Sequence, residues 1–395
     1  MFKSLMGWSR GTSESLLPRH GRSSNGFAAP WLVLALVFLG AETFAESPGI
    51  FRSPLNLPIP HSLDLGTFEF DIDPVAGSLA DTNFRRLQRK LGVFHAAGEE
   101  GVSGGGSSTE ADLEMMANKA NNPLSDVWLL IVENDTTLIG GNEVSGSETL
   151  NVTLIEPVLP VPVFDNEYNL IFRPILPIIS SPLDKDVGKL FGRSDAEIAG
   201  SPKLSKIAAD PYGERSAGLG DLIVLTLFGP NADDGFVYGA GVSTVFPTAT
   251  EDVLGAQKWQ IGPAALAVRL GTDHGGLGIE NWNIGFLAQQ WFSYAGTGDR
   301  EAVNRMNLQY FINWKMNATQ LIGMTPNIVI DWEEKDIDDA VSLPIGLGTI
   351  GMMKIGKLPI RWGVEVQYYV VQPDDAGPRV NFKVFFAPII LNPFK

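Results

Sequence analysis

Few residues of this chain have the types and spacing that catalysis requires. Three histidines, His61, His95 and His274, follow the first 45 residues, and His274 lies in a glycine-rich turn, TDHGGLG. The sequence has no Gly-x-Ser-x-Gly nucleophile elbow, no His-Glu-x-x-His zinc motif and no phosphate-binding loop. It also has no cysteine, which excludes thiol catalysis, disulfides and cysteine metal sites. We therefore predict that the protein is not an enzyme and needs no cofactor.

Acidic residues occur in adjacent pairs, an arrangement that can bind a metal ion. The run EEKDIDD (333–339) has the most carboxylates, and hard divalent cations prefer such oxygen ligands. The run lacks the glycine and the spacing of a calcium loop, so we interpret it as a solvated acidic loop and predict no metal site. Such pairs include Asp233-Asp234, Glu333-Glu334, Asp338-Asp339 and Asp374-Asp375.

The best candidate for a functional site is a set of polar residues that alternate with apolar ones. In RMNLQYFINWKM (305–316) every second residue from Met306 is apolar, and the residues between them are polar except Phe311. This period of two predicts a strand. The same pattern recurs at 360–370 and 380–386, so these strands should have one apolar and one polar face.

The polar faces are predicted to line the interior of a closed sheet, with Glu365 pairing with Lys383 across the last hairpin. An arginine or lysine that faced lipid at the membrane midplane would cost about 2–4 kcal/mol, which directs these residues inward if the apolar face meets lipid. They would either give a pore a weak anion preference or simply fill and hydrate the interior. The predicted lining residues are Arg173, Arg305, Asn307, Gln309, Asn313, Lys315, Arg361, Glu365, Gln367, Asn381 and Lys383.

From Ser125 onward the sequence predicts about twelve strands. Most have about 9–15 residues, the length of a tilted transmembrane strand, whereas strands of ordinary sheets average ~5–6. Prolines at 160, 162, 174 and 177 weaken the second and third strands, because proline cannot donate to a ladder. The predicted ranges are 125–133, 147–159, 167–179, 217–229, 234–246, 257–270, 280–294, 302–316, 319–331, 340–354, 358–371 and 378–391.

The connections between these strands alternate in character. One set contains the longest loop and most of the acidic ones, at 134–146, 180–216, 247–256, 295–301, 332–339 and 372–377. The other set, at 160–166, 230–233, 271–279, 317–318 and 355–357, contains several very short turns. Long outer loops and short periplasmic turns are typical of outer-membrane barrels. A soluble sandwich has no reason to keep this alternation.

The N-terminal part of the chain predicts export. Residues 29–41 (APWLVLALVFLGA) form an apolar run shorter than the ~20 residues of a spanning helix. Basic residues precede it, and Thr43-Phe44-Ala45 follows with small residues at the positions that a signal peptidase reads. We predict a cleaved signal peptide over 1–45, with an N-terminal membrane anchor as the alternative. An irregular periplasmic segment over 46–124 and a barrel over 125–395 would follow.

One helix is predicted over 109–122. Thr109 can cap its start, Asp112 and Glu114 suit its first turns, and Pro123 ends it. It is either a packing helix or a plug inside the pore.

Charge and aromatic residues bear on the partners of the protein. The net charge of −16 makes nucleic acid a poor partner, because nucleic-acid affinity depends on neutralising phosphates. Aromatic residues near strand ends are typical of the girdles at membrane interfaces. The predicted girdle residues are Trp259, Trp282, Trp291, Trp314, Trp332, Tyr294 and Trp362.

Six stretches of the sequence occur in the order of a known family: NNPLSDVWLL (121–130), YNLIFRPILPI (168–178), GLGDLIVLTLF (218–228), FPTATEDVLGAQKWQIGP (246–263), IVIDWEE (328–334) and YYVVQPDDAGP (368–378). With them the chain resembles the bacterial outer-membrane family of the meta-pathway of phenol degradation, often mislabelled neuromedin U. The resemblance implies a β-barrel that passes small, aromatic or apolar solutes. The Gly/Ser run at 103–108 and the connection at 180–216 depart from the family pattern.

These observations predict a closed antiparallel transmembrane β-barrel of about twelve strands with one N-terminal helix. The barrel would sit in the outer membrane of a Gram-negative-type bacterium and transport small solutes passively. Its partners would be outer-membrane lipid, the solute and the barrel-insertion machinery. Two alternatives stay open at this point: a structural or adhesive barrel without transport, and a secreted soluble β protein that binds an apolar ligand.

Overall fold

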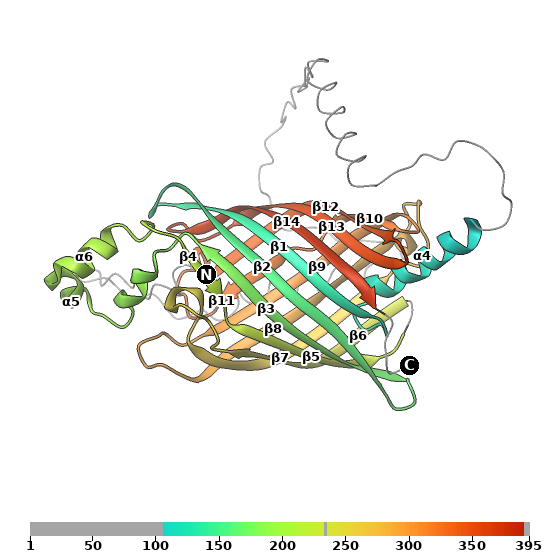
Figure 1. The fold of residues 1–395 in the computed structure, drawn as a ribbon, viewed down its shortest axis with the longest axis horizontal. Helices are drawn as coiled ribbons and strands as arrows, with labels where there is room; N and C mark the ends of the chain where they lie inside the picture. Colours follow the sequence, from blue (N-terminus) through green and yellow to red (C-terminus); the bar gives the residue numbers. More distant parts are fainter. Residues whose placement is uncertain (1–105, 233–234, 391–395) are drawn as a thin grey trace, which may run out of the picture. The chain divides into compact units, whose positions relative to one another are not determined.

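The computed structural model describes residues 106–232 and 235–390. The predicted signal peptide, residues 46–105 with His61 and His95, and the Asp233-Asp234 pair lie outside the described residues. Within the described part, strands from residue 128 onward form a single sheet, and short helices lie in its connections (Figure 1).

The strands are long and follow one another around the sheet, so that sequence neighbours are also neighbours in space. Every pairing is antiparallel. The strands are β1 (Trp128–Gly141), β2 (Val144–Val163), β3 (Tyr168–Ser181), β4 (Ser216–Leu219), β5 (Leu222–Pro230), β6 (Gly235–Phe246), β7 (Lys258–Leu270), β8 (Trp282–Gly296), β9 (Asn304–Asn317), β10 (Gln320–Met324), β11 (Asn327–Asp331), β12 (Val341–Ile355), β13 (Leu358–Val371) and β14 (Gly377–Ile390).

The sheet closes into a barrel because β14 pairs with β1 as well as with β13. β4 and β5 both pair with β3, and β10 and β11 both pair with β9 and β12, so each couple forms one interrupted strand. Thr325 and Pro326 separate β10 from β11, where proline removes a ladder donor. The wall of the barrel therefore contains twelve strands.

Helices lie at both ends of the barrel (Figure 1). α4 (Gly106–Asn121) lies at one end, which we call the helix end, and the connection 182–215 lies at the other, which we call the loop end. α4 begins at Gly106 rather than Thr109, so Thr109 lies within the helix instead of capping it. The other helices of the described residues are η1 (Lys185–Leu190), α5 (Asp195–Gly200), α6 (Pro202–Ala209), η2 (Asp252–Leu254), η3 (Ile279–Asn281) and α7 (Ile337–Ala340). Among the described residues, no helix has the length and apolar character to cross a membrane.

The prediction of an outer loop at 134–146 was wrong. β1 continues to Gly141 and β2 begins at Val144, so a tight turn joins them. The polar run in this region resembles a loop in sequence, but its side chains bond across the two strands. Asn134 Nδ2 donates to Thr153 Oγ1 at 2.8 Å, and Asn151 Nδ2 donates to Thr136 Oγ1 at 2.8 Å. These bonds stabilise the strands where apolar alternation is missing.

The two prolines near the end of the second strand are tolerated within the barrel. β2 extends to Val163, beyond the predicted end at 159, and includes Pro160 and Pro162. Its pairing with β1 ends at Val158, so both prolines lie where β2 pairs in register with β3 alone. Proline is accommodated at such an edge because its missing N–H can face the unpaired side.

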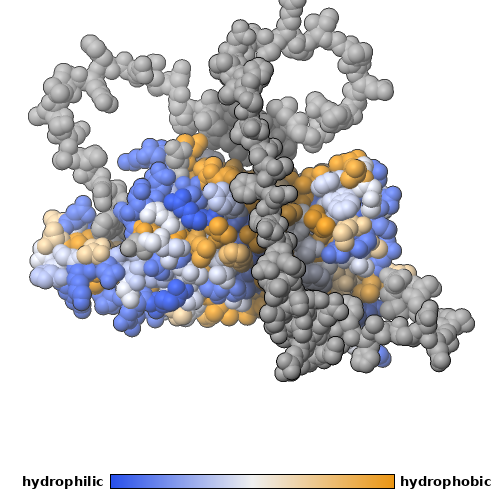
Figure 2. All heavy atoms as spheres, turned by 90° about the horizontal axis from the view of Figure 1, so that it is seen from above, coloured by the Kyte–Doolittle hydropathy of each residue, from blue (hydrophilic) through white to orange (hydrophobic). Residues whose placement is uncertain are grey.

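Side chains alternate across the wall with the apolar ones outside. On β13, Val364 and Val366 are 44% and 50% exposed, whereas Glu365 and Gln367 are 8% and 2% exposed. Figure 2 shows hydrophobic patches on the barrel wall. A soluble sheet would bury the apolar face instead, because burial of apolar area drives folding in water. The exterior therefore has the polarity of a surface that contacts lipid.

Aromatic side chains lie outside near both ends of the strands. At the helix end, Tyr168 stacks on Phe228 with ring centroids 5.0 Å apart, and Phe236 stacks on Tyr238. At the loop end, the rings of Phe246 and Trp259 make an edge-to-face contact. Aromatic girdles at both interfaces mark barrels that span a membrane.

The prediction of Trp291 as a girdle residue was wrong. Trp291 is 8% exposed, and its Nε1 donates to Ser243 Oγ at 2.8 Å. Ser243 in turn donates to Gln289 Oε1 at 2.9 Å. A tryptophan with a partner for its N–H can be buried, and here β8 places the ring on the inner face.

The loop-end connections pack on one another. Leu183 is fully buried with Ile139 of β1, Val144 of β2 and Ala376 of the connection between β13 and β14. The next turn of connection 182–215 packs its Val187 against the connection between β6 and β7. Phe191 of the same connection contacts the connection between β8 and β9, where the guanidinium carbon of Arg300 lies 3.8 Å from the centre of the Phe191 ring. Connection 182–215 is therefore anchored to several parts of the rim.

Candidate functional site

The interior of the helix end is occupied by the last turns of α4 and the residues that follow them. Ala117, Ala120 and Leu124 are buried in a cluster with inward-facing residues of the wall, including Leu225 of β5 and Leu266 of β7. The predicted helix thus contacts the inner surface of the barrel.

Hydrogen bonds join this segment to different parts of the wall. Asn169 Nδ2 of β3 donates to the carbonyl of Leu124 at 2.7 Å, and Lys315 Nζ of β9 donates to Asn118 Oδ1 at 3.2 Å. Asn122 donates to the carbonyl of Ala232 in the turn after β5. β3 and β9 lie on nearly opposite sides of the barrel, so the segment extends across its mouth.

Glycines of the wall make room for Leu124, which is fully buried. A β-carbon on Gly229 of β5 would lie 2.5 Å from Cδ1 of Leu124, and one on Gly239 of β6 would lie 3.1 Å from it. Both glycines are therefore matched to the leucine that enters the barrel mouth.

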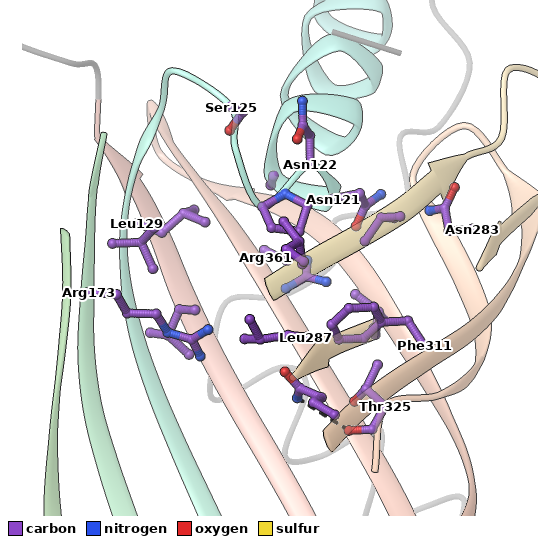
Figure 3. A pocket seen from close by; sticks show the side chains of 18 of the residues that line it. Asn121, Asn122, Ser125, Leu129, Arg173, Asn283, Leu287, Phe311, Thr325 and Arg361 are labelled. Carbon is purple, nitrogen blue, oxygen red and sulfur yellow. Dashed lines mark hydrogen bonds between the residues drawn. The ribbon is translucent and has the colours of Figure 1, made fainter. Parts of the chain in front are cut away.

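Two cavities flank this segment. The first has about 480 Å³ and lies between α4 and the ends of β7 and β9, lined by Glu114, Lys119 and Lys315 among others. The second, which we call the chamber, has about 150 Å³ and lies deeper in the barrel (Figure 3). Asn121 and Asn283 line both cavities, so they lie where the cavities approach each other.

The chamber has an apolar side and a polar side. Leucines of β1, β5, β7 and β8 contribute to the apolar side, with Phe311 of β9. The charged residues that line it are Glu133, Arg173 and Arg361, and Figure 3 shows both arginines pointing into it. A solute inside would therefore meet hydrocarbon on one side and charge on the other.

Two of these charged residues belong to ion pairs. Arg173 Nε donates to Glu156 Oε2 at 2.8 Å, and Glu133 Oε1 lies 3.1 Å from Lys383 Nζ. The guanidinium of Arg361 lies 5.1 Å from the centre of the Phe385 ring, and its buried Nε has no hydrogen-bond acceptor in the described part of the chain.

A hydrogen-bonded polar network lies next to the chamber toward the loop end. Gln367 Nε2 donates to Glu365 Oε1 at 3.0 Å, and Asn381 Nδ2 donates to Asp135 Oδ1 at 2.6 Å and to Gln367 Oε1 at 3.3 Å. Glu365 also accepts from the backbone N–H of Thr325 at 3.0 Å. These side chains bond to one another and to the wall, and together they fill this part of the interior.

The structure places the eleven predicted lining residues at different depths. Arg173, Gln309, Asn313 and Arg361 line the chamber, while Lys315 lies at the helix end. Arg305 donates to Asp331 Oδ2 at 2.7 Å, and Asn307 is in register with the buried Gln289. The remaining four, which are Glu365, Gln367, Asn381 and Lys383, form or adjoin the polar network.

Several interior residues were missed from the sequence. Glu133 and Glu156 lie within predicted strands but were not assigned to the lining, and Asp135 lies beyond the predicted end of the first strand at 133. The alternation Leu129, Ile131, Glu133, Asp135 is visible in the sequence and could have identified them. The predicted Glu365–Lys383 ion pair is replaced by Glu133–Lys383.

The acidic pairs within the described residues and His274 form no cluster that could hold a metal ion. His274 is exposed in the connection 271–281. Across residues 106–232 and 235–390, no three histidine or carboxylate side chains gather in a way that could hold a metal ion.

Comparison with known proteins gives a likeness of fold. The sequence matches no protein-family model and no curated protein. An outer membrane channel from Pseudomonas putida F1 has 13% identity and a TM-score of 0.44, over 67% of this chain and 96% of that one. NanC porin has 10% identity and a TM-score of 0.38, over 66% and 100%. The P. putida toluene transporter TodX has 8% identity and a TM-score of 0.32, over 68% and 92%. At these values function must be argued from the geometry of the chain itself.

Proposed function

We propose that this protein is an outer-membrane β-barrel channel for the passive passage of small solutes. The observation that carries the proposal is the inverted polarity of the closed barrel. Val366 and Phe382 face outward with about half of their surface exposed, while the adjacent Gln367 and Lys383 are 2% exposed in the interior. In lipid every backbone group must be paired, and closure of β1 on β14 meets that requirement.

The interior supports passage of a small solute rather than a large one. The cavity beside α4 and the chamber below it approach each other at Asn121 and Asn283. The chamber volume of about 150 Å³ equals that of cavities that accept benzene. We further propose that the solute is small and aromatic or apolar in body. This agrees with the sequence resemblance to the phenol meta-pathway family, to which we propose that the chain belongs.

We propose that two segments control the path. The α4 end closes the helix end through Leu124, and connection 182–215 covers part of the loop end through Leu183 and Phe191. The helix end would face the periplasm, because the turns there are the short ones. We further propose that a cleaved signal peptide directs export, that the barrel-insertion machinery inserts the chain, and that outer-membrane lipid surrounds the barrel.

The test is conductance of the mature chain in a planar bilayer. We expect small unitary currents from the wild type and larger ones from a variant that lacks residues 46–122. Equal currents from both chains would contradict the gate, and no current from inserted, heat-modifiable barrels would contradict the channel.

A structural barrel with a sealed interior is the second candidate. The observation in its favour is that ion pairs and the network around Gln367 and Asn381 fill the interior next to the chamber. Insertion without current, in the wild type and in the deletion variant alike, would favour this candidate.

A further inference from the structure

The chamber is lined by one arginine, Arg361, that forms no direct ion pair among the described residues. Its charged lining residues are Glu133, Arg173 and Arg361. Glu133 pairs with Lys383 and Arg173 pairs with Glu156, so each of these charges is balanced. Arg361 forms no ion pair with any described residue, and its Nε lacks an acceptor.

An unpaired guanidinium is costly in such surroundings. Burial of an ion away from water is unfavourable unless a counter-charge and hydrogen bonds replace the lost hydration. The Phe385 ring, 5.1 Å from the guanidinium, offers a cation–π contact but accepts no directed hydrogen bond. A planar oxyanion would satisfy two donors of the guanidinium at once.

The rest of the chamber selects the body of such an anion. Leu225, Leu227, Leu266 and Leu287 present hydrocarbon, with Phe311 beside them. The volume of about 150 Å³ suits one ring or a short chain, whereas drug-sized ligands occupy pockets of about 300–1,000 Å³.

We propose that the chamber binds a small organic monocarboxylate, an inference that rests on the proposed channel function. The carboxylate pairs with Arg361, and the apolar ring or chain packs against Leu225, Leu287 and Phe311. Figure 3 shows Arg361, Leu287 and Phe311 around the same space. The site would be a selective step along the path, passing apolar acids more readily than neutral compounds of the same shape.

A single negative charge fits the site better than two. Among the described lining residues, Arg361 alone is a cation without an ion pair, and a second anionic group would lie among leucines or near the carboxylate of Glu133. Dicarboxylates and phosphate monoesters should therefore bind more weakly than monocarboxylates.

The test is direct binding of benzoate to the full mature protein in detergent, measured by calorimetry beside benzyl alcohol. We expect the wild type to bind benzoate at least tenfold more tightly than the alcohol. Arg361→Gln should abolish this preference, and Arg361→Lys should retain part of it because the charge stays. Arg269→Gln is the matched control, because Arg269 is exposed on the outer face of β7; it should leave affinity unchanged.

Equal affinity for benzoate and benzyl alcohol in the wild type would overturn the proposal, as would an Arg361→Gln variant that keeps the preference. If Arg361→Gln fails to fold, as judged by heat-modifiability, the wild-type comparison and Arg361→Lys decide. Benzoate flux into vesicles separates the two proposals. Binding without flux would contradict the channel alone, and flux without preference or dependence on Arg361 would contradict the carboxylate site alone.

Discussion

Lys383 Nζ lies 3.1 Å from Oε1 of Glu133, although Glu365 stands directly opposite Lys383 in the register of the last hairpin. Glu365 is instead held by Thr325, whose backbone N–H and hydroxyl both donate to it, at 3.0 and 2.9 Å. Lys383 is on β14 and Glu133 on β1, so the ion pair spans the seam where the barrel closes. The two side chains are 2% and 15% exposed, which makes the pair a buried one.

We expect Glu133→Gln to destabilise the barrel markedly. Removal of one partner leaves the Lys383 ammonium buried without its counter-charge, and breaking buried pairs in this way costs about 3–5 kcal/mol. The double variant Glu133→Gln, Lys383→Met should recover much of this loss, because no uncompensated charge remains. Urea unfolding in lipid vesicles measures both.

The single variant Lys383→Met completes the comparison. If the stability loss of the double variant equals the sum of the losses in the two single variants, Glu133 and Lys383 do not interact. Lys354→Met on β12 is a control, because this lysine forms no ion pair among the described residues and lies near the short turn at the helix end.

Most of the fold was predictable because strand alternation is a local property. Met306 to Met316, apart from Phe311, and Ile360 to Val370 alternate in polarity, and the structure confirms both as strands of a closed barrel. The polar run around Asn134 was not recognised as strand, because its stability comes from bonds to Asn151 and Thr153 on the neighbouring strand.

The candidate site was less predictable than the fold. Alternation identifies which residues face inward but not which of them pair, because pairing depends on the depth of each side chain and on a third strand. Glu133 was therefore missed as the partner of Lys383. The burial of Leu124 was also not predictable, because it requires Gly229 and Gly239. These glycines come close to Leu124 only in the closed barrel.

We expect Tyr212, in connection 182–215, to titrate late. Burial and the nearby carboxylates of Glu143 and Glu148 raise its pKa to about 12. An unfolded tyrosine ionises near pH 10. Between about pH 10 and 12 the unfolded chain therefore loses a proton that the folded chain keeps, so loop stability should fall over this range. Absorbance at alkaline pH measures the midpoint, with Tyr212→Phe as the subtraction control.

Tyr212→Phe should not lower stability at neutral pH. The hydroxyl is buried without a hydrogen-bond partner in the described part of the chain, so its loss leaves no group newly unpaired. A midpoint near pH 10, or a clear loss of stability in the phenylalanine variant, would contradict this account.

We expect Leu124→Ala to loosen the plug and raise conductance. Leu124 is fully buried against the glycines of β5 and β6, and leucine-to-alanine changes in packed sites cost about 2–5 kcal/mol. The lost packing free energy weakens the attachment of the segment around Leu124, which extends across the mouth of the barrel. Single-channel recording in planar bilayers measures the effect.

The control for this experiment is Leu183→Ala. Leu183 is equally buried but belongs to the loop-end cluster with Ile139 and Val144. It should weaken the loop end without opening the helix end. Conductance of Leu124→Ala equal to that of the wild type would show that Leu124 does not close the path.

We expect Val364→Arg to impair insertion and stability. Val364 is 44% exposed near the middle of β13, where the outer face would meet the centre of the bilayer. An arginine at the midplane costs about 2–4 kcal/mol, whereas one near the interface costs about 0–1 kcal/mol. Ile355→Arg is the matched control, because Ile355 is 63% exposed at the end of β12, beside the helix-end turn. Urea titration in vesicles should show a large loss for Val364→Arg and little for Ile355→Arg. In a soluble barrel both changes would be harmless, since each would place a charge in water, so equal stability of the two variants would refute the membrane assignment.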